Sequence, residues 1–238
     1  MNSTLADAAR RLHVVQEGVA IPAVYWAPPG ACKGIVLACH GGSGHKLSQA
    51  VLAIAGVSLP LGLAVLAIDG PVHGERRTDG SLDPQIAVRS FREAWAAGVG
   101  KASMAREMAA ALDALMREPG FAGLPVGYIG VSMGTAYGIP LLASDRRIRA
   151  AAIGLWGANF PGSEHLVALA REIACPVWFT QQWNDQTFDR EGVFALFDAV
   201  AATDKRLVAY PGPHRELEGE RLADAMAFLH SRLKEPTP

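Results

Sequence analysis

The pentapeptide Gly130-Val131-Ser132-Met133-Gly134 is the part of the sequence best suited to do chemistry. This G-x-S-x-G pattern directly follows an apolar run that predicts a strand and opens a segment that predicts a helix, which is the context in which such a serine acts as a nucleophile. A tight strand-to-helix turn lifts the hydroxyl above the sheet, and the flanking glycines let strand and helix pass closely. The alternative is a plain turn in which Ser132 only caps the helix, because serine is a favoured N-cap residue.

An activated serine needs a base and an acid that orients the base, and both residue types follow Ser132 in the chain. Asp185 comes just after the apolar run 176–182, at the C-terminal end of a predicted strand, where open α/β sheets build their sites. His214 lies between the last predicted strand and the C-terminal helix. Asp189 is the competing acid, but it falls where a helix should begin and where a carboxylate favours the helix dipole. The order predicts a triad of Ser132, Asp185 and His214.

A glycine-rich segment, HGGSGHK at 40–46, follows the first central strand of the predicted sheet. Glycine has no β-carbon to block an approaching group, so its N–H can face a developing oxyanion. The predicted oxyanion hole combines the N–H groups of Gly42 and Met133, with that of Ser43 as a further candidate, and each donor contributes roughly 3 kcal/mol. A phosphate-binding loop is the alternative, but the segment lacks the G-x-x-x-x-G-K-[ST] spacing.

Short apolar runs alternate with longer Ala-rich segments from Lys33 onward, which is typical of an α/β fold. The runs are apolar throughout, as in strands buried on both faces of a parallel sheet; they lie at 34–39, 63–69, 126–131, 150–156, 176–182 and 206–212. The segments between them predict helices on both faces of the sheet, at about 46–58, 100–117, 133–143, 164–172, 188–201 and 218–234. Before them, two extended runs around Glu17-Gly18 predict a hairpin at the sheet edge.

The 238 residues contain no internal repeat and no low-complexity linker, so we expect a single domain over 1–238. The segment 70–98 is the one long connection without a clear strand. Its second half, PQIAVRSFREAWAAG, predicts a helix. Long connections of this kind are often functional, and both a partial lid and a plain extra helix packed on the sheet are compatible with it.

Composition excludes several classes of partner. The 22 basic and 23 acidic residues nearly cancel, so no global field attracts a nucleic acid or an anionic membrane. The longest apolar-rich stretch, 51–68, is broken by glycine and proline and does not predict a membrane span. Three cysteines without a CxxC spacing favour a reduced, cytoplasmic location. The expected partner is a small, mostly uncharged molecule, and a homodimer is left open.

Five residues are candidates for a substrate pocket. Trp156 and Phe160 follow one predicted strand, and Trp183 immediately precedes the acid, so all three could line an apolar pocket above the serine. Ser43 and His73 are the polar candidates. Core packing explains the aromatic side chains equally well.

A metal site is the alternative use of His40, His45, Asp69 and His73, since imidazoles and carboxylates bind zinc. No HExxH or comparable local pair joins these residues, and a serine triad needs no metal. The sequence therefore predicts neither a metal nor another cofactor. Hydrogen bonds that brace the loops after the strands are the expected role of His40 and Asp69.

Taken together, the HGG loop, the G-x-S-x-G turn, the strand-end aspartate and the late histidine resemble the α/β-hydrolase superfamily over about 34–233. The compact size, the HGGSGHK loop and the stretch DGPVHGER at 69–76 are similar to the dienelactone hydrolase and small carboxylesterase branch. Dienelactone hydrolases use a cysteine nucleophile, whereas position 132 is serine. The resemblance thus implies a serine esterase and does not carry over the lactone substrate.

The expected function is hydrolysis of a small carboxylic ester through an acyl-enzyme intermediate. Thioester, amide and C–C bond hydrolysis, and acyl transfer to an acceptor other than water, would use the same triad, and the sequence does not separate them. A non-catalytic small-molecule binding protein on the same fold is the alternative from another class.

Overall fold

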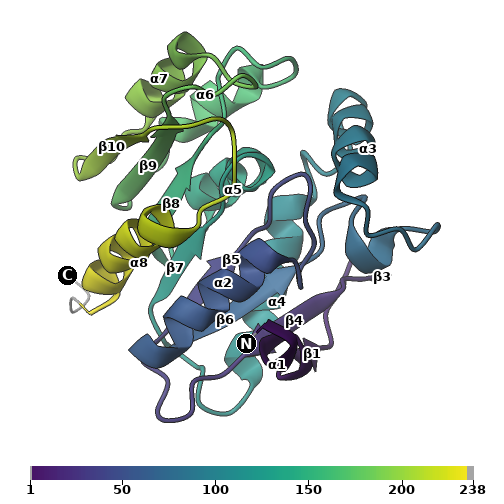
Figure 1. Cartoon of the computed structure of the whole chain (residues 1–238). Helices are drawn as coiled ribbons and strands as arrows, with labels where there is room; N and C mark the ends of the chain where they lie inside the picture. The colour runs from purple at the N-terminus through teal and green to yellow at the C-terminus, as the bar shows by residue number, and fades with distance from the viewer. Residues whose placement is uncertain (1, 235–238) are drawn as a thin grey trace.

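A computed structural model describes residues 2–234 and is built around one eight-stranded sheet in the order β1-β4-β6-β5-β7-β8-β9-β10 (Figure 1). All neighbours from β6 to β10 pair in parallel, and β1 and β4 add an antiparallel edge. The strands are β1 (Arg10–Leu12), β4 (Ala23–Trp26), β5 (Gly34–Ala38), β6 (Leu63–Ile68), β7 (Val126–Ile129), β8 (Ile148–Gly154), β9 (Val177–Gln182) and β10 (Lys205–Tyr210). The predicted parallel sheet is confirmed, with each predicted strand matched to within two residues.

The central strands are apolar on both sides because two layers of helices cover them. Successive side chains of a strand point to opposite faces, so Ile35 and Leu37 of β5 enter one core while Val36 and Ala38 enter the other. Strand β10 differs from the prediction of a fully buried strand. It is the edge of the sheet, and several of its side chains, including that of Arg206, reach solvent.

Helices lie on both faces of the sheet, as predicted (Figure 1). One face carries α1 (Asn2–Asp7), α2 (Gln49–Ser58) and α8 (Gly219–Leu233). The other carries α4 (Met104–Arg117), α5 (Met133–Ser144), α6 (Glu164–Ala170) and α7 (Arg190–Ala199).

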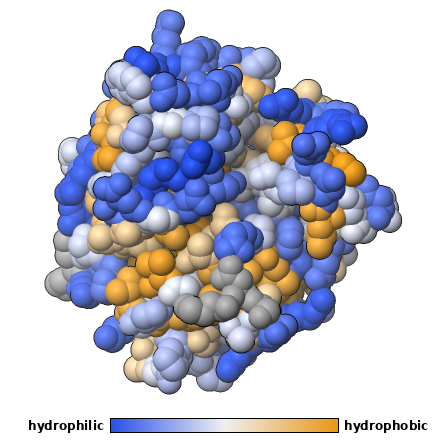
Figure 2. Space-filling view, in the orientation of Figure 1, coloured by the Kyte–Doolittle hydropathy of each residue, from blue (hydrophilic) through white to orange (hydrophobic). Residues whose placement is uncertain are grey.

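Polar side chains cover much of the face seen in Figure 2, and apolar ones gather over α2, whose sequence contains no charged residue.

The N-terminal lead-in forms the expected hairpin. Strands β2 (Val15–Gln16) and β3 (Val19–Ala20) pair in antiparallel fashion around Glu17 and Gly18, whose φ angles are 52° and 79°. Positive φ at both central residues is what a two-residue hairpin turn of type I′ requires.

The long connection 70–98 contains a short 3-10 turn (Gly74–Arg76) and helix α3 (Pro84–Ala96), which stands at one edge of the molecule in Figure 1. Asp83 caps α3 by accepting the N–H groups of Gln85 and Ile86. Phe91 and Trp95 are buried against the body of the protein, and Trp95 Nε1 donates to Pro161 O at 2.9 Å. The predicted helix is therefore present and is packed through its aromatic face.

Among residues 2–234, no helix combines the length and apolar character needed to cross a bilayer. Cys32, Cys39 and Cys175 are all free thiols.

Candidate active site

Ser132 occupies the turn between β7 and α5 with φ 57° and ψ −121°, a conformation that residues other than glycine rarely adopt. The surrounding backbone holds it there. Ser132 N–H donates to Gly154 O at 3.0 Å, and Ser132 O accepts the N–H of Thr135 at 2.9 Å. Such strain persists only where the structure over-determines it, and here it presents the hydroxyl above the carboxyl ends of the strands.

Glycine is required on both sides of Ser132 because the turn passes close to the end of β5. A Cβ at position 134 would lie 2.9 Å from Cys39 O, and one at position 130 would lie 3.0 Å from Cys39 Cβ. The Tyr128 hydroxyl also donates to Gly134 O at 2.5 Å. The two glycines of the motif thus permit close packing, as the sequence predicts.

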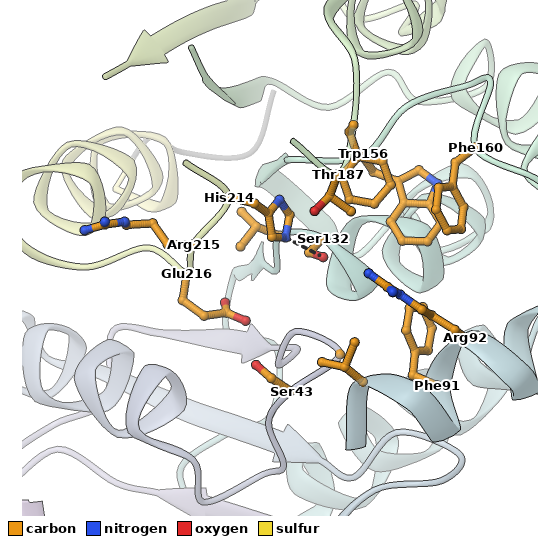
Figure 3. Close-up of a pocket in the computed structure, with 14 residues that line it drawn as sticks. Ser43, Phe91, Arg92, Ser132, Trp156, Phe160, Thr187, His214, Arg215 and Glu216 are labelled. Atoms are coloured by element: carbon orange, nitrogen blue, oxygen red, sulfur yellow. Dashed lines mark hydrogen bonds between the residues drawn. The ribbon is translucent and has the colours of Figure 1, made fainter. Parts of the chain in front are cut away.

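Three side chains from distant parts of the chain meet at this turn (Figure 3). The Ser132 hydroxyl donates to His214 Nε2 at 3.1 Å, and His214 Nδ1–H donates to Asp185 Oδ2 at 2.8 Å. The histidine tautomer that satisfies both bonds leaves Nε2 free to take a proton from the serine. The structure therefore brings together the three residues that the sequence order singles out.

The Asp185 carboxylate is held on both of its oxygens. Oδ2 faces His214, while Oδ1 accepts the N–H groups of Thr187 at 2.7 Å and Phe188 at 3.0 Å. Burial opposes ionisation, but the His214 hydrogen bond and charge, together with these two N–H groups, lower the pKa of Asp185 below its ordinary value. The acid stays ionised near neutral pH and keeps one orientation.

Asp189, the competing acid, caps helix α7. Its side chain accepts Gly192 N–H at 2.8 Å and Asn159 Nδ2–H at 2.7 Å. The carboxylate that contacts His214 is that of Asp185. Asp189 has the helix-capping position that its place in the sequence predicts.

Two histidines orient consecutive peptide groups of the glycine-rich loop. His40 Nδ1–H donates to Gly41 O at 2.7 Å, which turns the opposite end of that planar peptide, the Gly42 N–H, away from His40. His73 Nε2–H donates to Gly42 O at 2.9 Å and holds the next peptide in the same way. Among residues 2–234, neither the Gly42 nor the Met133 N–H has a protein hydrogen-bond partner. Both are available as oxyanion donors.

The orientation of His40 requires the neutral ring. Its Nε2 accepts the Gly70 N–H at 2.9 Å, which a protonated nitrogen could not do. Burial accordingly lowers the pKa of His40 well below its ordinary value, and burial also lowers the pKa of His73.

The residues weighed as metal ligands have other partners. Asp69 accepts from Lys46 Nζ at 2.7 Å and from the Lys46 and Glu75 N–H groups, each at 2.9 Å. His45 Nδ1 accepts the Leu47 N–H at 3.2 Å. Within the described part of the chain, no set of three His, Cys, Asp or Glu side chains is arranged to hold a metal ion.

A cavity of about 170 Å³ opens above Ser132. Of the five pocket candidates, Ser43, Trp156 and Phe160 line it (Figure 3). His73 does not, because its ring is buried behind the glycine-rich loop. Trp183 does not either: it is 49% exposed, and its ring stacks under the Arg190 guanidinium at 3.7 Å.

Several lining residues were not predicted. Val88, Phe91 and Arg92 come from α3, Thr187 and Phe188 from the loop after Asp185, and Arg215 and Glu216 from the segment after His214. The rings of Trp156 and Phe188 lie 4.7 Å apart and form an aromatic wall with Phe160. The four-residue spacing of Phe91 and Trp95 was the one signal in the sequence for the contribution of α3.

Gln182, the last residue of β9, holds the segment that carries His214. Its buried amide makes a pair of hydrogen bonds with the backbone of Arg215: Arg215 N–H donates to Oε1 at 2.7 Å, and Nε2–H donates to Arg215 O at 3.1 Å. The same strand leads directly into the loop that carries Asp185. One side chain thus ties the histidine segment to the strand that positions the acid.

Solved structures resemble this chain closely. A PEG-bound cold-adapted esterase from an Arctic intertidal metagenomic library is 35% identical over 95% of this chain and 93% of that one, with a TM-score of 0.82. A zinc-bound structure of a cold-adapted esterase from such a library is 32% identical with the same coverage and a TM-score of 0.77. Dienelactone hydrolase from Anabaena variabilis, at 22% identity over 94% of this chain and 97% of that one, shares the fold with a TM-score of 0.67.

No protein-family model and no curated protein matches the sequence. The identity to the cold-adapted esterase extends over nearly the full length of both chains, and the mostly parallel sheet with helices on both faces is the architecture expected from the sequence. The chain therefore belongs to the same family as these cold-adapted esterases, hydrolytic enzymes of the α/β-hydrolase fold, and it shares that fold with dienelactone hydrolase.

Proposed function

We propose that the protein is a serine carboxylesterase that hydrolyses a small-molecule ester through Ser132, His214 and Asp185. The observation that carries the proposal is the continuous chain of hydrogen bonds from the Ser132 hydroxyl through His214 to Asp185, at 3.1 Å and 2.8 Å. Nucleophile, base and orienting acid in this geometry are the requirement for acyl transfer.

In the acylation step, His214 Nε2 takes the Ser132 proton as the oxygen attacks the ester carbonyl. The negative charge that develops on the carbonyl oxygen is stabilised by the Gly42 and Met133 N–H groups. The Gly42 donor needs no reorganisation, because His40 and His73 already hold the peptide groups on either side of it. His214 then gives its proton to the departing alcohol. Asp185 stabilises the imidazolium and retains its own negative charge.

In the deacylation step, His214 removes a proton from water, and the resulting nucleophile attacks the acyl-enzyme. The carboxylic acid leaves and Ser132 regains its proton. Every proton in the cycle moves between substrate, water, Ser132 and His214, so the mechanism uses no cofactor. The aromatic wall of Trp156, Phe160 and Phe188 supports a small substrate with an apolar part.

Thioester, amide or C–C bond hydrolysis and acyl transfer to another acceptor would use the same side chains. A binding protein without turnover is the alternative outside catalysis. The strained turn at Ser132 favours an enzyme, since strain of this kind concentrates at sites of chemistry. A cytoplasmic location remains our expectation.

A fluorophosphonate probe is expected to label the folded protein at Ser132. The mass of the protein should rise by that of one bound probe per chain, and esterase activity should fall in proportion to labelling. Both labelling and hydrolysis should be unchanged after exhaustive chelation, because each step has been assigned to a protein group. Peptide mapping and activity assays with and without chelator measure this. Absence of labelling would favour a binding protein, and inactivation by chelator that zinc reverses would show that a metal takes part.

Replacement of Gln182 by leucine is expected to lower kcat about 10²-fold with a much smaller change in KM. The reason is that His214 loses the anchor of its segment, and a misplacement near 1 Å costs about this much. Gln181→Leu is the matched control: Gln181 is equally buried on the same strand, but its amide donates only to Gln182 O. Steady-state kinetics of both variants, each first shown to melt at the wild-type temperature, test whether Gln182 positions His214. Equal losses of kcat in the two variants would assign Gln182 a purely structural role.

A further inference from the structure

One wall of the cavity carries two polar side chains that the proposed mechanism does not use, Ser43 and Glu216 (Figure 3). They face the cavity from the glycine-rich loop and from the segment after His214, on the side away from Trp156 and Phe160. The cavity therefore has an aromatic wall and a polar wall, with Ser132 between them.

The backbone directs Glu216 into the cavity. The segment between β10 and α8 is not helical, and its side chains alternate: those of His214 and Glu216 face the site, while the side chain of Arg215, a residue at the cavity rim, extends away from Ser132 (Figure 3). The pair of hydrogen bonds between the Gln182 amide and the Arg215 backbone holds this arrangement. The Glu216 carboxyl lies so close to the glycine-rich loop that any side chain at position 41 would overlap its Oε1.

Glu216 has no cationic partner among the described residues. The neighbouring arginines, Arg215 and Arg221, pair with the exposed Glu218 instead. Ser43 likewise makes no side-chain hydrogen bond within residues 2–234. Ser43 is exposed and Glu216 is half-buried at the cavity, so both side chains keep hydrogen-bonding capacity that a bound ligand can use.

The chemistry of this wall fits a neutral group that both donates and accepts. Burial raises the pKa of Glu216 to about 7, against the opposing effects of His214 and of the Gly41 N–H. A protonated carboxyl has one donor and further acceptor capacity, as has the Ser43 hydroxyl. An alcohol hydroxyl has the matching capacity, since it can accept from the protonated carboxyl and donate to the ionised one, whereas a carboxylate or phosphate would be repelled by the ionised carboxyl.

We propose that Ser43 and Glu216 form a specificity subsite that binds a hydroxyl group of the substrate, so that the preferred substrates are hydroxylated esters. The inference rests on the proposed function and deepens it. The aromatic wall takes the apolar part of the substrate and the polar wall its hydroxyl. A site that hydrogen-bonds a substrate hydroxyl discriminates strongly against the analogue without it, because its own polar groups are then left unpaired.

The kinetic test compares matched esters with the same leaving group or the same acid: 3-hydroxybutyrate with butyrate for the acyl side, and 2-hydroxyethyl with propyl esters for the alcohol side. The wild-type enzyme should favour the hydroxylated member of one pair at least tenfold in kcat/KM. Glu216→Leu should reduce that ratio to about one, Ser43→Ala should reduce it severalfold, and Glu216→Gln, which keeps a donor and an acceptor, should retain most of it. Glu218→Leu, a change of an exposed glutamate outside the cavity, is the control and should leave the ratio unaltered.

A binding measurement separates this inference from the proposed function. Calorimetric titration of the Ser132→Ala variant with the same ester pairs, with and without Glu216→Leu, reports the preference without turnover. Tighter binding of a hydroxylated ester that is lost in the double variant supports the subsite even if the wild-type protein hydrolyses nothing, in which case only the proposed function fails. Equal binding of both members of both pairs, or equal loss of the hydroxylated and plain esters on Glu216→Leu, overturns the subsite while leaving the esterase activity standing.

Discussion

Ser132→Ala is expected to reduce kcat for ester hydrolysis by about 10⁶-fold, the order of loss seen when the nucleophile of a serine triad is removed. Without the hydroxyl, no acyl-enzyme can form. Only the oxyanion donors and substrate positioning remain, and these still accelerate the attack of water by some 10³–10⁴-fold over the uncatalysed reaction. Steady-state assays with an activated aryl ester, on protein free of host esterases, measure the loss.

The fold should survive this substitution because the Ser132 hydroxyl has a single protein partner, His214 Nε2. Circular dichroism and thermal melting provide the check. Ser144→Ala is a suitable control, since that hydroxyl donates to Pro140 O in helix α5 and lies outside the cavity. More than about 1% residual activity, well above the expected loss, would point to a different nucleophile. Cys39 is a poor candidate for it, because burial raises the pKa of its thiol to about 12.

The strand ends could be predicted because the signal for them is local. Ser132 and Asp185 each follow a short apolar run closely, and His214 follows the last run of the sheet. Parallel strands of one sheet bring their carboxyl ends to the same edge, so residues far apart in sequence converge there without any knowledge of the loops. The proximity of these three side chains therefore follows from strand order and the α/β pattern alone.

The wall residues of the cavity could not be predicted in this way because they depend on which face each side chain takes. Gln182 is the last residue of β9 and Trp183 is the first residue of the turn that follows, so the alternation of side chains along the strand does not fix the direction of the Trp183 side chain. Gln182 is buried and bonds Arg215, while Trp183 turns outward against Arg190. The outward direction of Trp183 is a property of this turn, and the sequence contains no marker for it.

Segment 70–98 illustrates a second limit. The spacing of Phe91 and Trp95 predicts one apolar face on a helix, and the helix is present. What that face packs against is a tertiary property: Trp95 lies 5.1 Å and Phe91 6.1 Å from Trp156, ring centre to ring centre. The contact partner belongs to a loop more than fifty residues away in the chain, so neither a lid nor a packed helix could be inferred from the segment itself.

The second large effect is expected at the acid. Asp185→Asn should lower kcat by about 10⁴-fold, because an amide in place of the carboxylate lets His214 adopt the wrong tautomer and no longer stabilises its charged form. In the structure, the Asp185 carboxylate accepts His214 Nδ1–H at 2.8 Å and is held by the Thr187 and Phe188 N–H groups. Those backbone donors would still face the side-chain oxygen of asparagine, which leaves its NH₂ toward His214.

Asp189→Asn is the matched substitution and should leave kcat nearly unchanged. Asp189 caps α7 by accepting the Gly192 N–H at 2.8 Å, and asparagine is an equally good N-cap residue. Loss of the negative charge at the helix N-terminus should cost about 0.3–1 kcal/mol of stability. Kinetics and thermal melting of both variants give the comparison. A severely impaired Asp189→Asn enzyme, together with a nearly normal Asp185→Asn enzyme, would reverse the assignment of the acid. His214 would then be oriented by Asp189, whose carboxylate in this structure accepts hydrogen bonds from Asn159 and Gly192.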